Sequence, residues 1–175
     1  MKLKSVLLAA ALGLAAGAVS ARAADYSVTL AKVHLCCDSC VDGANDAIAA
    51  VAGASLDADK AAKSITITAP DVATAQKAVD ALITAGYTGV PSDPAIHIAA
   101  AANVPAGEVS ALTLSNVHLC CKKCVTSFNA AIAKVPGIAG STAAKDANSF
   151  VITGRFNAQA VMAALNAAGF SAKVD

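Results

Sequence analysis

Apolar and polar residues along the chain follow two periods, one of two residues and one of about 3.6 residues. Residues 26–30 alternate between apolar and polar side chains, which predicts a strand with one buried face. Further short strands are predicted over 54–58, 64–69 and 87–90, with a polar turn over 59–63. The first half of the chain therefore contains several half-buried strands.

Segments whose apolar residues recur at helical spacing lie between these strands. One predicted helix stops at Gly53, and a second opens at Pro70 and ends before Gly86. Their apolar faces carry Val41, Ala44, Ile48 and Val51 in the first helix, and Ala75, Val79, Leu82 and Ile83 in the second. The order strand, helix, strand, strand, helix, strand is that of a ferredoxin-like split βαβ unit.

The same pattern occurs twice. A stretch V-H-L-C-C-x-x-C-V covers 33–41 and recurs over 117–125, an offset of 84 residues (118 − 34). The helix that follows matches at the same offset, with Asn45, Ala47, Ile48, Val51 and Gly53 opposite Asn129, Ala131, Ile132, Val135 and Gly137. We therefore predict an α+β chain of two tandem ferredoxin-like βαββαβ sandwiches, with domain 1 over 25–91, a linker over 92–108 and domain 2 over 109–175.

The N-terminus has the pattern of a signal peptide. Lys2 and Lys4 precede an unbroken apolar run over 6–19, and Ala21-Arg22-Ala23 supplies small residues for cleavage after Ala23. This run is shorter than the roughly 18 residues that suggest a membrane span. We expect a signal peptide over 1–23 and a mature, exported protein in a bacterial periplasm, without stable membrane insertion after cleavage.

All six cysteines lie in the repeated stretch: Cys36, Cys37 and Cys40, and then Cys120, Cys121 and Cys124. Thiolates are soft ligands that select Cu(I), Zn(II), Cd(II) or Hg(II). A C-x-x-C at the start of a helix lies beside unpaired N–H groups and the positive end of the helix dipole, which favours the thiolate. Structural disulfides are the alternative in an exported protein, but adjacent cysteines repeated in each domain suit a disulfide framework poorly.

Each unit resembles the heavy-metal-associated domain found in copper chaperones, in the N-terminal regions of metal-pumping P-type ATPases and in the periplasmic mercury-scavenging protein. The matching segments are 37–48 and 82–87 in the first unit, and 121–132 and 169–170 in the second. The resemblance implies that each domain holds one soft metal ion, with Cys37 and Cys40, and Cys121 and Cys124, as the ligands. Leu35 and Leu119 replace the usual methionine of that family, a conservative packing change.

The extra cysteine before each pair is the larger departure from the family. Cys36 and Cys120 can supply a third thiolate, which would convert a two-coordinate Cu(I) or Hg(II) site into one suited to Zn(II), Cd(II) or a thiolate-rich Cu(I) cluster. Alternatively, each is an outward-facing thiol in place of a polar loop residue. The sequence leaves both interpretations open.

His34 and His118 are the less certain ligands. Each would complete a set of three sulfurs and one nitrogen, as in structural zinc sites. Strand alternation, however, sends the histidine to the face opposite the inward leucine, which favours a surface or supporting position. Tyr87 and Phe170 correspond to a family position that can approach the metal loop, and we expect them to pack in the core.

The two loops differ in charge, because Lys122 and Lys123 stand where the first copy has Asp38 and Ser39. We expect more readily formed thiolates in the second loop, and hence different affinities or redox potentials for the two sites. A flexible linker of about 16 residues spans on the order of 20–24 Å, enough for both loops to face one metal ion. Its apolar island, 96–98, is equally suited to packing on a domain.

The formal net charge of +1 and the scarcity of aromatic residues argue against a nucleic-acid partner. No residues form a Ser-His-Asp set, a phosphate loop or paired catalytic carboxylates, so no enzymatic activity is predicted. The predicted function is sequestration or transfer of soft metal by thiolate exchange, with a metal-transporting membrane protein or another metal chaperone as partner. The alternative is a periplasmic thiol-disulfide redox protein using the C-x-x-C pairs.

Overall fold

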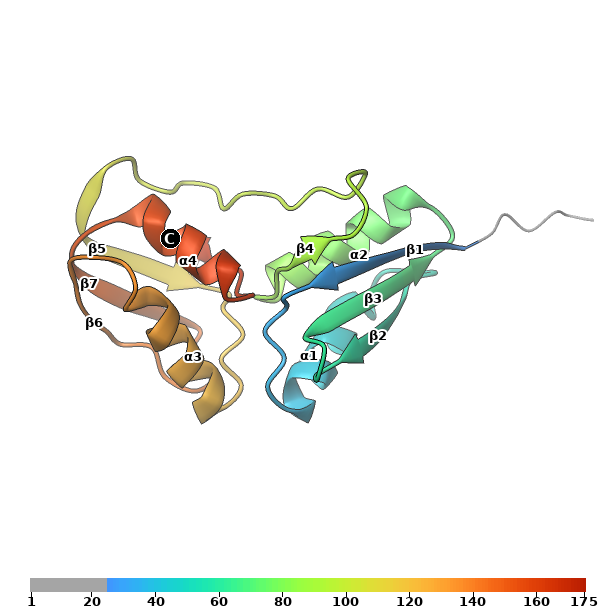
Figure 1. Ribbon diagram of the computed structural model, residues 1–175, viewed down its shortest axis with the longest axis horizontal. Helices are drawn as coiled ribbons and strands as arrows, with labels where there is room; N and C mark the ends of the chain where they lie inside the picture. Colours follow the sequence, from blue (N-terminus) through green and yellow to red (C-terminus); the bar gives the residue numbers. More distant parts are fainter. Residues whose placement is uncertain (1–24) are drawn as a thin grey trace, which may run out of the picture.

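The computed structural model describes residues 25–175, so the predicted signal peptide lies outside the described residues. Two four-stranded antiparallel sheets each carry two helices (Figure 1). The first unit comprises β1 (Tyr26–Ala31), α1 (Asp38–Ile48), β2 (Ser55–Asp59), β3 (Ser64–Ala69), α2 (Val72–Thr84) and β4 (Val90–Pro91). The second comprises β5 (Glu108–Ser115), α3 (Lys122–Ile132), β6 (Ile138–Ser141), β7 (Ser149–Asn157), α4 (Ala158–Ala167) and β8 (Lys173–Val174).

The strand order is β2-β3-β1-β4 in one sheet and β6-β7-β5-β8 in the other. The predicted α+β class is confirmed, and the order βαββαβ occurs in both halves. This order makes β1 and β5 central strands, each antiparallel to both of its neighbours. Because each central strand runs directly into a cysteine loop, the sheet fixes where that loop begins.

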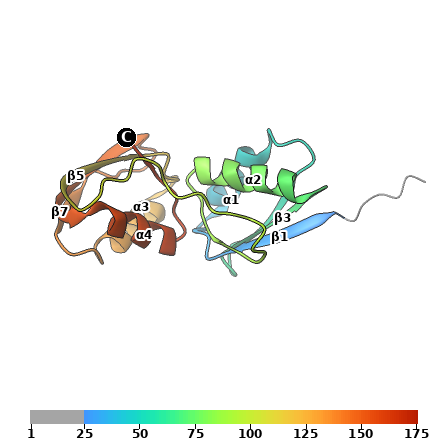
Figure 2. The same ribbon diagram turned by 90° about the horizontal axis from the view of Figure 1, so that it is seen from above.

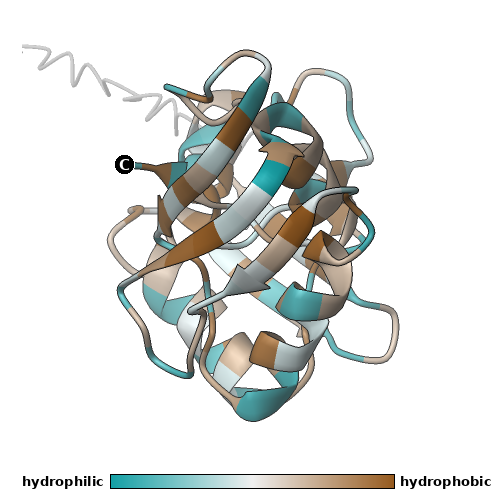
Figure 3. Ribbon diagram, turned by 90° about the vertical axis from the view of Figure 1, so that its left-hand side faces the viewer, coloured by the Kyte–Doolittle hydropathy of each residue, from teal (hydrophilic) through white to brown (hydrophobic). Residues whose placement is uncertain are grey.

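Each sheet buries one face beneath its two helices. Residues along β3 alternate between half-buried and buried, and the strands of the second unit show the same alternation as brown and paler bands in Figure 3. The second core is built around aromatic rings, with Phe128 on α3 meeting Phe150 on β7 edge-to-face at 4.9 Å between centroids. These two cores hold the helices that present the cysteines.

Two element boundaries differ from the predictions. The first helix ends at Ile48, and the chain then turns through Gly53, whose φ of +82° is left-handed. The last strand of the first unit is only Val90–Pro91, since Tyr87 forms a bridge with Phe170 of the other unit instead of extending the sheet. The segment over 87–89 therefore belongs to the contact between the units.

The two units lie side by side in a nearly two-fold arrangement, with their helices on opposite sides when seen from above (Figure 2). The segment after the second helix of each unit, which we call its tail, forms hydrogen bonds with the tail of the other unit. The Ser171 amide donates to the Gly86 carbonyl at 2.9 Å, and the Thr88 amide donates to the Gly169 carbonyl at 3.3 Å. These paired bonds join the segments that follow α2 and α4, which meet where the two units come together in Figure 1.

The linker follows the first unit before it crosses to the second. Ile96 is buried, and the backbone of His97 exchanges two hydrogen bonds with the side chain of Gln76 on α2. The apolar island therefore packs on a domain. Within residues 25–175, none of the helices combines the length and apolar character needed to cross a membrane.

Candidate metal centre

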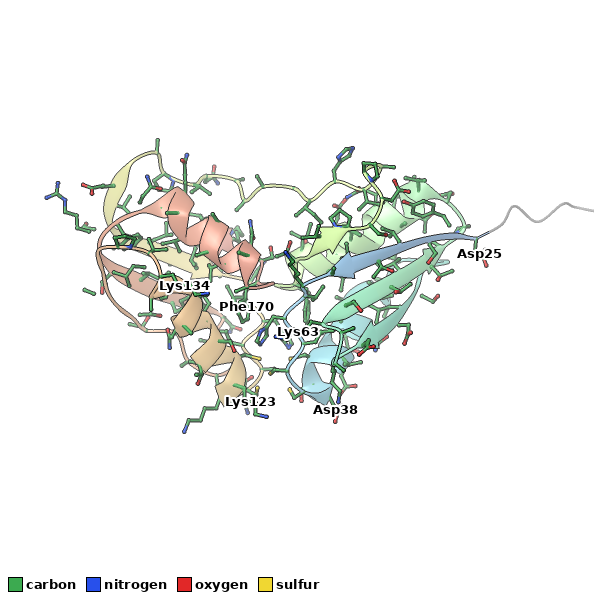
Figure 4. All side chains as sticks on the ribbon, in the orientation of Figure 1. Asp25, Asp38, Lys63, Lys123, Lys134 and Phe170 are labelled. Atoms are coloured by element: carbon green, nitrogen blue, oxygen red, sulfur yellow. The ribbon has the colours of Figure 1, made fainter. Side chains whose placement is uncertain are left out.

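The two cysteine loops meet between the units. The first helix of each unit begins directly after the first cysteine of its C-x-x-C pair. Cys37 and Cys121 are the N-cap residues of α1 and α3, and both have extended backbone. Cys40 and Cys124 lie in the first turn of these helices and are completely buried. Because the two helices start at facing positions, their sulfur atoms gather in the space between them (Figure 4).

All six cysteines are free thiols, and their sulfurs form one continuous cluster. Within the loops, the Sγ–Sγ contacts are Cys36–Cys40 and Cys37–Cys40 at 3.7 Å, and Cys120–Cys124 and Cys121–Cys124 at 3.6 Å. Between the loops, they are Cys36–Cys121 and Cys36–Cys124 at 3.4 Å, Cys40–Cys120 at 3.6 Å, Cys37–Cys120 and Cys40–Cys124 at 3.8 Å, and Cys37–Cys121 at 3.9 Å. We call these six residues the cysteine cluster.

The donor set fits a soft metal ion. Several groups of three ligand atoms lie within 4.8 Å of one another, including the sulfurs of Cys37, Cys40 and Cys120, and a set formed by His34 with Cys36 and Cys124. Both of these groups mix residues of the two units, while a further group, Cys120 with Cys121 and Cys124, comes from the second loop alone. Sulfur and imidazole nitrogen are the ligands that Cu(I), Zn(II) and related ions prefer. The cysteine cluster can therefore hold metal.

Hydrogen bonds within the cysteine cluster polarise its two buried thiols. The Cys40 and Cys124 sulfurs are hydrogen-bonded at 3.8 Å, and this bond lowers the pKa of Cys40 and raises that of Cys124. The Cys36 amide also donates to the Cys40 sulfur at 3.5 Å. Cys40 is therefore stabilised as a thiolate at the centre of the cluster, and thiolate is the form that binds metal.

The outer thiols respond to their surroundings in different ways. Burial raises the pKa of Cys36 to about 12 and also raises the pKa of Cys120. The nearby Cys124 amide at the start of α3 lowers the pKa of Cys121 to about 6, although the sulfur makes no standard capping bond. The helix terminus, more than the neighbouring lysines, therefore favours a thiolate at Cys121.

The two histidines are half-buried between the units. His34 stacks on Phe170 with 4.2 Å between ring centroids, and His118 packs on Tyr87 at 4.5 Å. Each imidazole thus contacts an aromatic ring of the opposite unit, and each Nε2 is buried without a hydrogen-bond partner. Alternation placed each histidine opposite its leucine, and the other unit partly covers that face, so of the two predicted positions the histidines occupy the supporting one beside the sulfurs.

His34 and His118 also lie close to buried cysteines of the opposite unit. His34 shares a potential ligand group with Cys124, and His118 helps to lower the pKa of Cys40. Burial lowers the pKa of His34, which leaves its imidazole in the neutral form that ligates metal or hydrogen-bonds a thiolate. The histidines are therefore placed to ligate or to support the metal-binding sulfurs.

Tyr87 and Phe170 occupy equivalent positions in the two units but make different contacts. Both are buried, as predicted for core residues. The Tyr87 hydroxyl also donates to the Cys40 carbonyl at 2.8 Å, and Phe170 lies between the units in Figure 4. A side chain at Gly43 would meet the Tyr87 hydroxyl at 2.6 Å. The glycine on α1 thus makes room for the tyrosine, a requirement that the sequence pattern did not reveal.

The rim of the cysteine cluster remains open to solvent. Cys36 lines a hollow beside the β2–β3 turn, and Cys120 lines a second hollow that includes Asp146 and Asn148. Lys60 from that turn pairs with the exposed carboxylate of Asp38 at the start of α1. Each of the two extra cysteines thus lines a separate hollow at the surface.

The structure brings together all eight predicted ligand residues. Cys36 and Cys120 contact sulfurs of both units, and do not stand as isolated outward thiols. The prediction of one ion per domain assumed two separate sites, whereas the two loops share one cluster. The residues that sequence reasoning missed are the tail glycines, Gly86 and Gly169, whose carbonyls join the units.

No family model and no curated protein matches the chain. Among solved structures, the N-terminal soluble domains of Bacillus subtilis CopA are similar, with 11% sequence identity over 87% of this chain and 95% of that chain, and a TM-score of 0.30. With identity and TM-score this low, the function of this chain has to be inferred from its own site.

Proposed function

We propose that this chain is an exported protein that binds soft metal ions, Cu(I), Zn(II), Cd(II) or Hg(II), through the cysteine cluster. The observation that carries the proposal is the continuous set of Sγ–Sγ contacts between 3.4 and 3.9 Å across the two units. Six thiols this close cannot all ionise unless a cation neutralises the thiolates, since like charges in contact repel. Metal binding offsets that repulsion and stabilises the contact between the units.

The proposed activity is sequestration of the metal or its transfer by ligand exchange. Exchange requires an incoming thiolate to reach the metal before the outgoing one leaves. The partly exposed Cys36 and Cys120 line open hollows on the rim, whereas Cys40 and Cys124 are buried. A partner would displace the rim sulfurs first and the buried sulfurs last. A metal-transporting membrane protein or another metal chaperone is the proposed partner.

Export is proposed from the positively charged start, the apolar run over 6–19 and the small residues before position 24. Cell fractionation and N-terminal sequencing of the processed protein test it. We expect the protein in the periplasmic fraction with Ala24 as its first residue. An unprocessed protein that stays in the cytoplasm would refute this part of the proposal.

Native mass spectrometry of the anaerobically purified mature protein, with parallel thiol counting, tests metal binding. We expect bound metal and six reduced thiols that become accessible when a chelator removes the metal. A serine variant of all six cysteines is the control and should carry no metal. A metal-free protein whose thiols form reversible intramolecular disulfides would instead support the redox alternative.

A further inference from the structure

The sulfur contacts form triangles, and every triangle contains cysteines of both units. Four sets of three sulfurs are in complete mutual contact: Cys36-Cys121-Cys124, Cys36-Cys40-Cys124, Cys40-Cys120-Cys124 and Cys37-Cys40-Cys120. The nearly two-fold arrangement exchanges the first set with the last, and the second with the third. A single loop does not supply all three sulfurs of any of these sets.

The grouping of the sulfurs in threes, and not the length of their contacts, favours three-coordinate ions. For a metal–sulfur bond of about 2.3 Å, the sulfur–sulfur separation is about 4.6 Å in linear, 4.0 Å in trigonal and 3.8 Å in tetrahedral coordination. The contacts of 3.4–3.9 Å are too short for a linear site. A tetrahedral ion needs four ligand atoms close together, and each group formed by the described residues holds three, including the one in which His34 joins Cys36 and Cys124. Zinc in structural sites is almost always tetrahedral, whereas Cu(I) is a soft ion that thiolates select and that accepts three of them.

The triangles also share their corners. Cys40 and Cys124 each belong to three triangles, Cys36 and Cys120 to two, and Cys37 and Cys121 to one. If each triangle takes one ion, the buried sulfurs must bridge several ions. Bridging lets six thiolates with a total charge of −6 bind four monovalent ions, which leaves a net charge of −2 (−6 + 4) beside the exposed Lys122 and Lys123.

We propose that the cysteine cluster holds a single polynuclear Cu(I)–thiolate cluster, with one ion for each sulfur triangle, in place of one ion per domain. This inference rests on the proposed function and specifies its metal and its capacity. No electron is transferred when copper binds as Cu(I), and each thiol that becomes a ligand releases its proton to solvent. Because every ion takes sulfurs from both units, neither unit can form the centre alone.

The test is anaerobic titration of the reduced mature chain with Cu(I) from a copper–chelator complex, followed by native mass spectrometry and copper X-ray absorption. We expect a cooperative step from the metal-free form to the form with one Cu(I) per triangle, and scattering from a neighbouring copper atom. Saturation at any other number, or the absence of copper–copper scattering, would overturn the inference. One mononuclear Cu(I) on each C-x-x-C pair would overturn the inference but leave the proposed function intact. If the protein bound no copper, zinc, cadmium or mercury, the inference and the proposed function would both be wrong.

A double variant, Cys36→Ser with Cys120→Ser, removes one sulfur from every triangle. Every triangle contains one of these two cysteines, and both C-x-x-C pairs remain. We expect at most one Cu(I) on each remaining pair, no copper–copper scattering, and an unchanged circular dichroism spectrum. Ser39→Ala, an exposed change in the first turn of α1, is the matched control and should retain the full cluster. Cooperative uptake by the double variant at the wild-type number would refute the inference.

Discussion

Cys40 and Cys124 form the buried base of the centre, and the other four cysteines form its partly exposed rim. The division has chemical consequences at the level of single residues. A buried sulfur keeps its metal from water and competing ligands, while a rim sulfur can be displaced by an incoming thiolate. The neighbouring imidazoles of His34 and His118 add polar groups to the contact between the units, and each Nε2 is buried from solvent.

Replacing His118 by phenylalanine tests whether the imidazole acts on the metal-binding sulfurs. The phenyl ring preserves packing on Tyr87 but removes the nitrogen that helps to stabilise the Cys40 thiolate. Loss of a group that supports metal ligands commonly costs about 10–100-fold in affinity, and we expect a loss in that range for Cu(I), measured by competition with a chromophoric chelator. His97→Phe, on the exposed linker, is the control and should bind as the wild type does. Equal affinity in both variants would show that His118 only packs.

At the level of the helices, metal binding competes with helix stability. The second helix of each unit has a side-chain N-cap, with Asp71 accepting from the Thr74 amide and Asn157 accepting from the Ala160 amide. The first helices begin at Cys37 and Cys121, which make no capping bond. Ser, Thr, Asp and Asn are the favoured N-cap residues. The sequence thus places cysteines where helix stability alone would favour a polar residue.

Cys121→Asn should therefore stabilise the metal-free fold while weakening metal binding. We expect the free energy of unfolding to rise by about 1 kcal/mol, because asparagine can cap α3, as measured by urea denaturation of the reduced protein. Asn157→Ala is the reciprocal control. It removes the existing N-cap of α4 and should lower the free energy of unfolding by a similar amount. If Cys121→Asn instead lowers the free energy of unfolding, the cysteine already stabilises the unpaired backbone N–H groups at the start of α3.

For the whole molecule, the contact between the units decides whether a shared centre exists. Gly86 and Gly169 have left-handed φ values of +93° and +82°, and the backbone of the opposite unit approaches each closely. A Cβ atom at Gly169 would lie 2.3 Å from the His34 amide nitrogen and 2.4 Å from the Lys32 carbonyl oxygen. These glycines therefore allow the two units to approach closely enough for their sulfurs to touch.

Gly169→Ala should separate the units. We expect an increased radius of gyration in small-angle X-ray scattering of the metal-free protein and loss of the cooperative copper-loaded form. Gly107→Ala is a matched control, because its φ is +81° but no atom lies within 4 Å of the added Cβ. It carries the same left-handed backbone cost of about 1–2 kcal/mol without the clash. If Gly169→Ala leaves both the radius of gyration and the copper uptake unchanged, the contact between the units does not hold the sulfurs together.

The sequence predicted the contents of each unit better than the relation between the units. Periodicity and the repeat reveal elements within one unit, because the burial of each element depends on neighbours close in the same fold. The faces that meet between units carry no such pattern. His34 lies between the buried Val33 and Leu35, so alternation correctly assigned it to the opposite face, but nothing indicated that Phe170 would cover that face. Tyr87 was assigned to a strand for the same reason.

Anomalous diffraction from crystals of the copper-loaded protein would show whether both units supply one metal centre. A shared centre requires a compact group of copper peaks between the starts of α1 and α3, with each copper bound by sulfurs of both units. Two separate peaks, each bound only by the C-x-x-C pair of its own unit, Cys37 with Cys40 and Cys121 with Cys124, would contradict it.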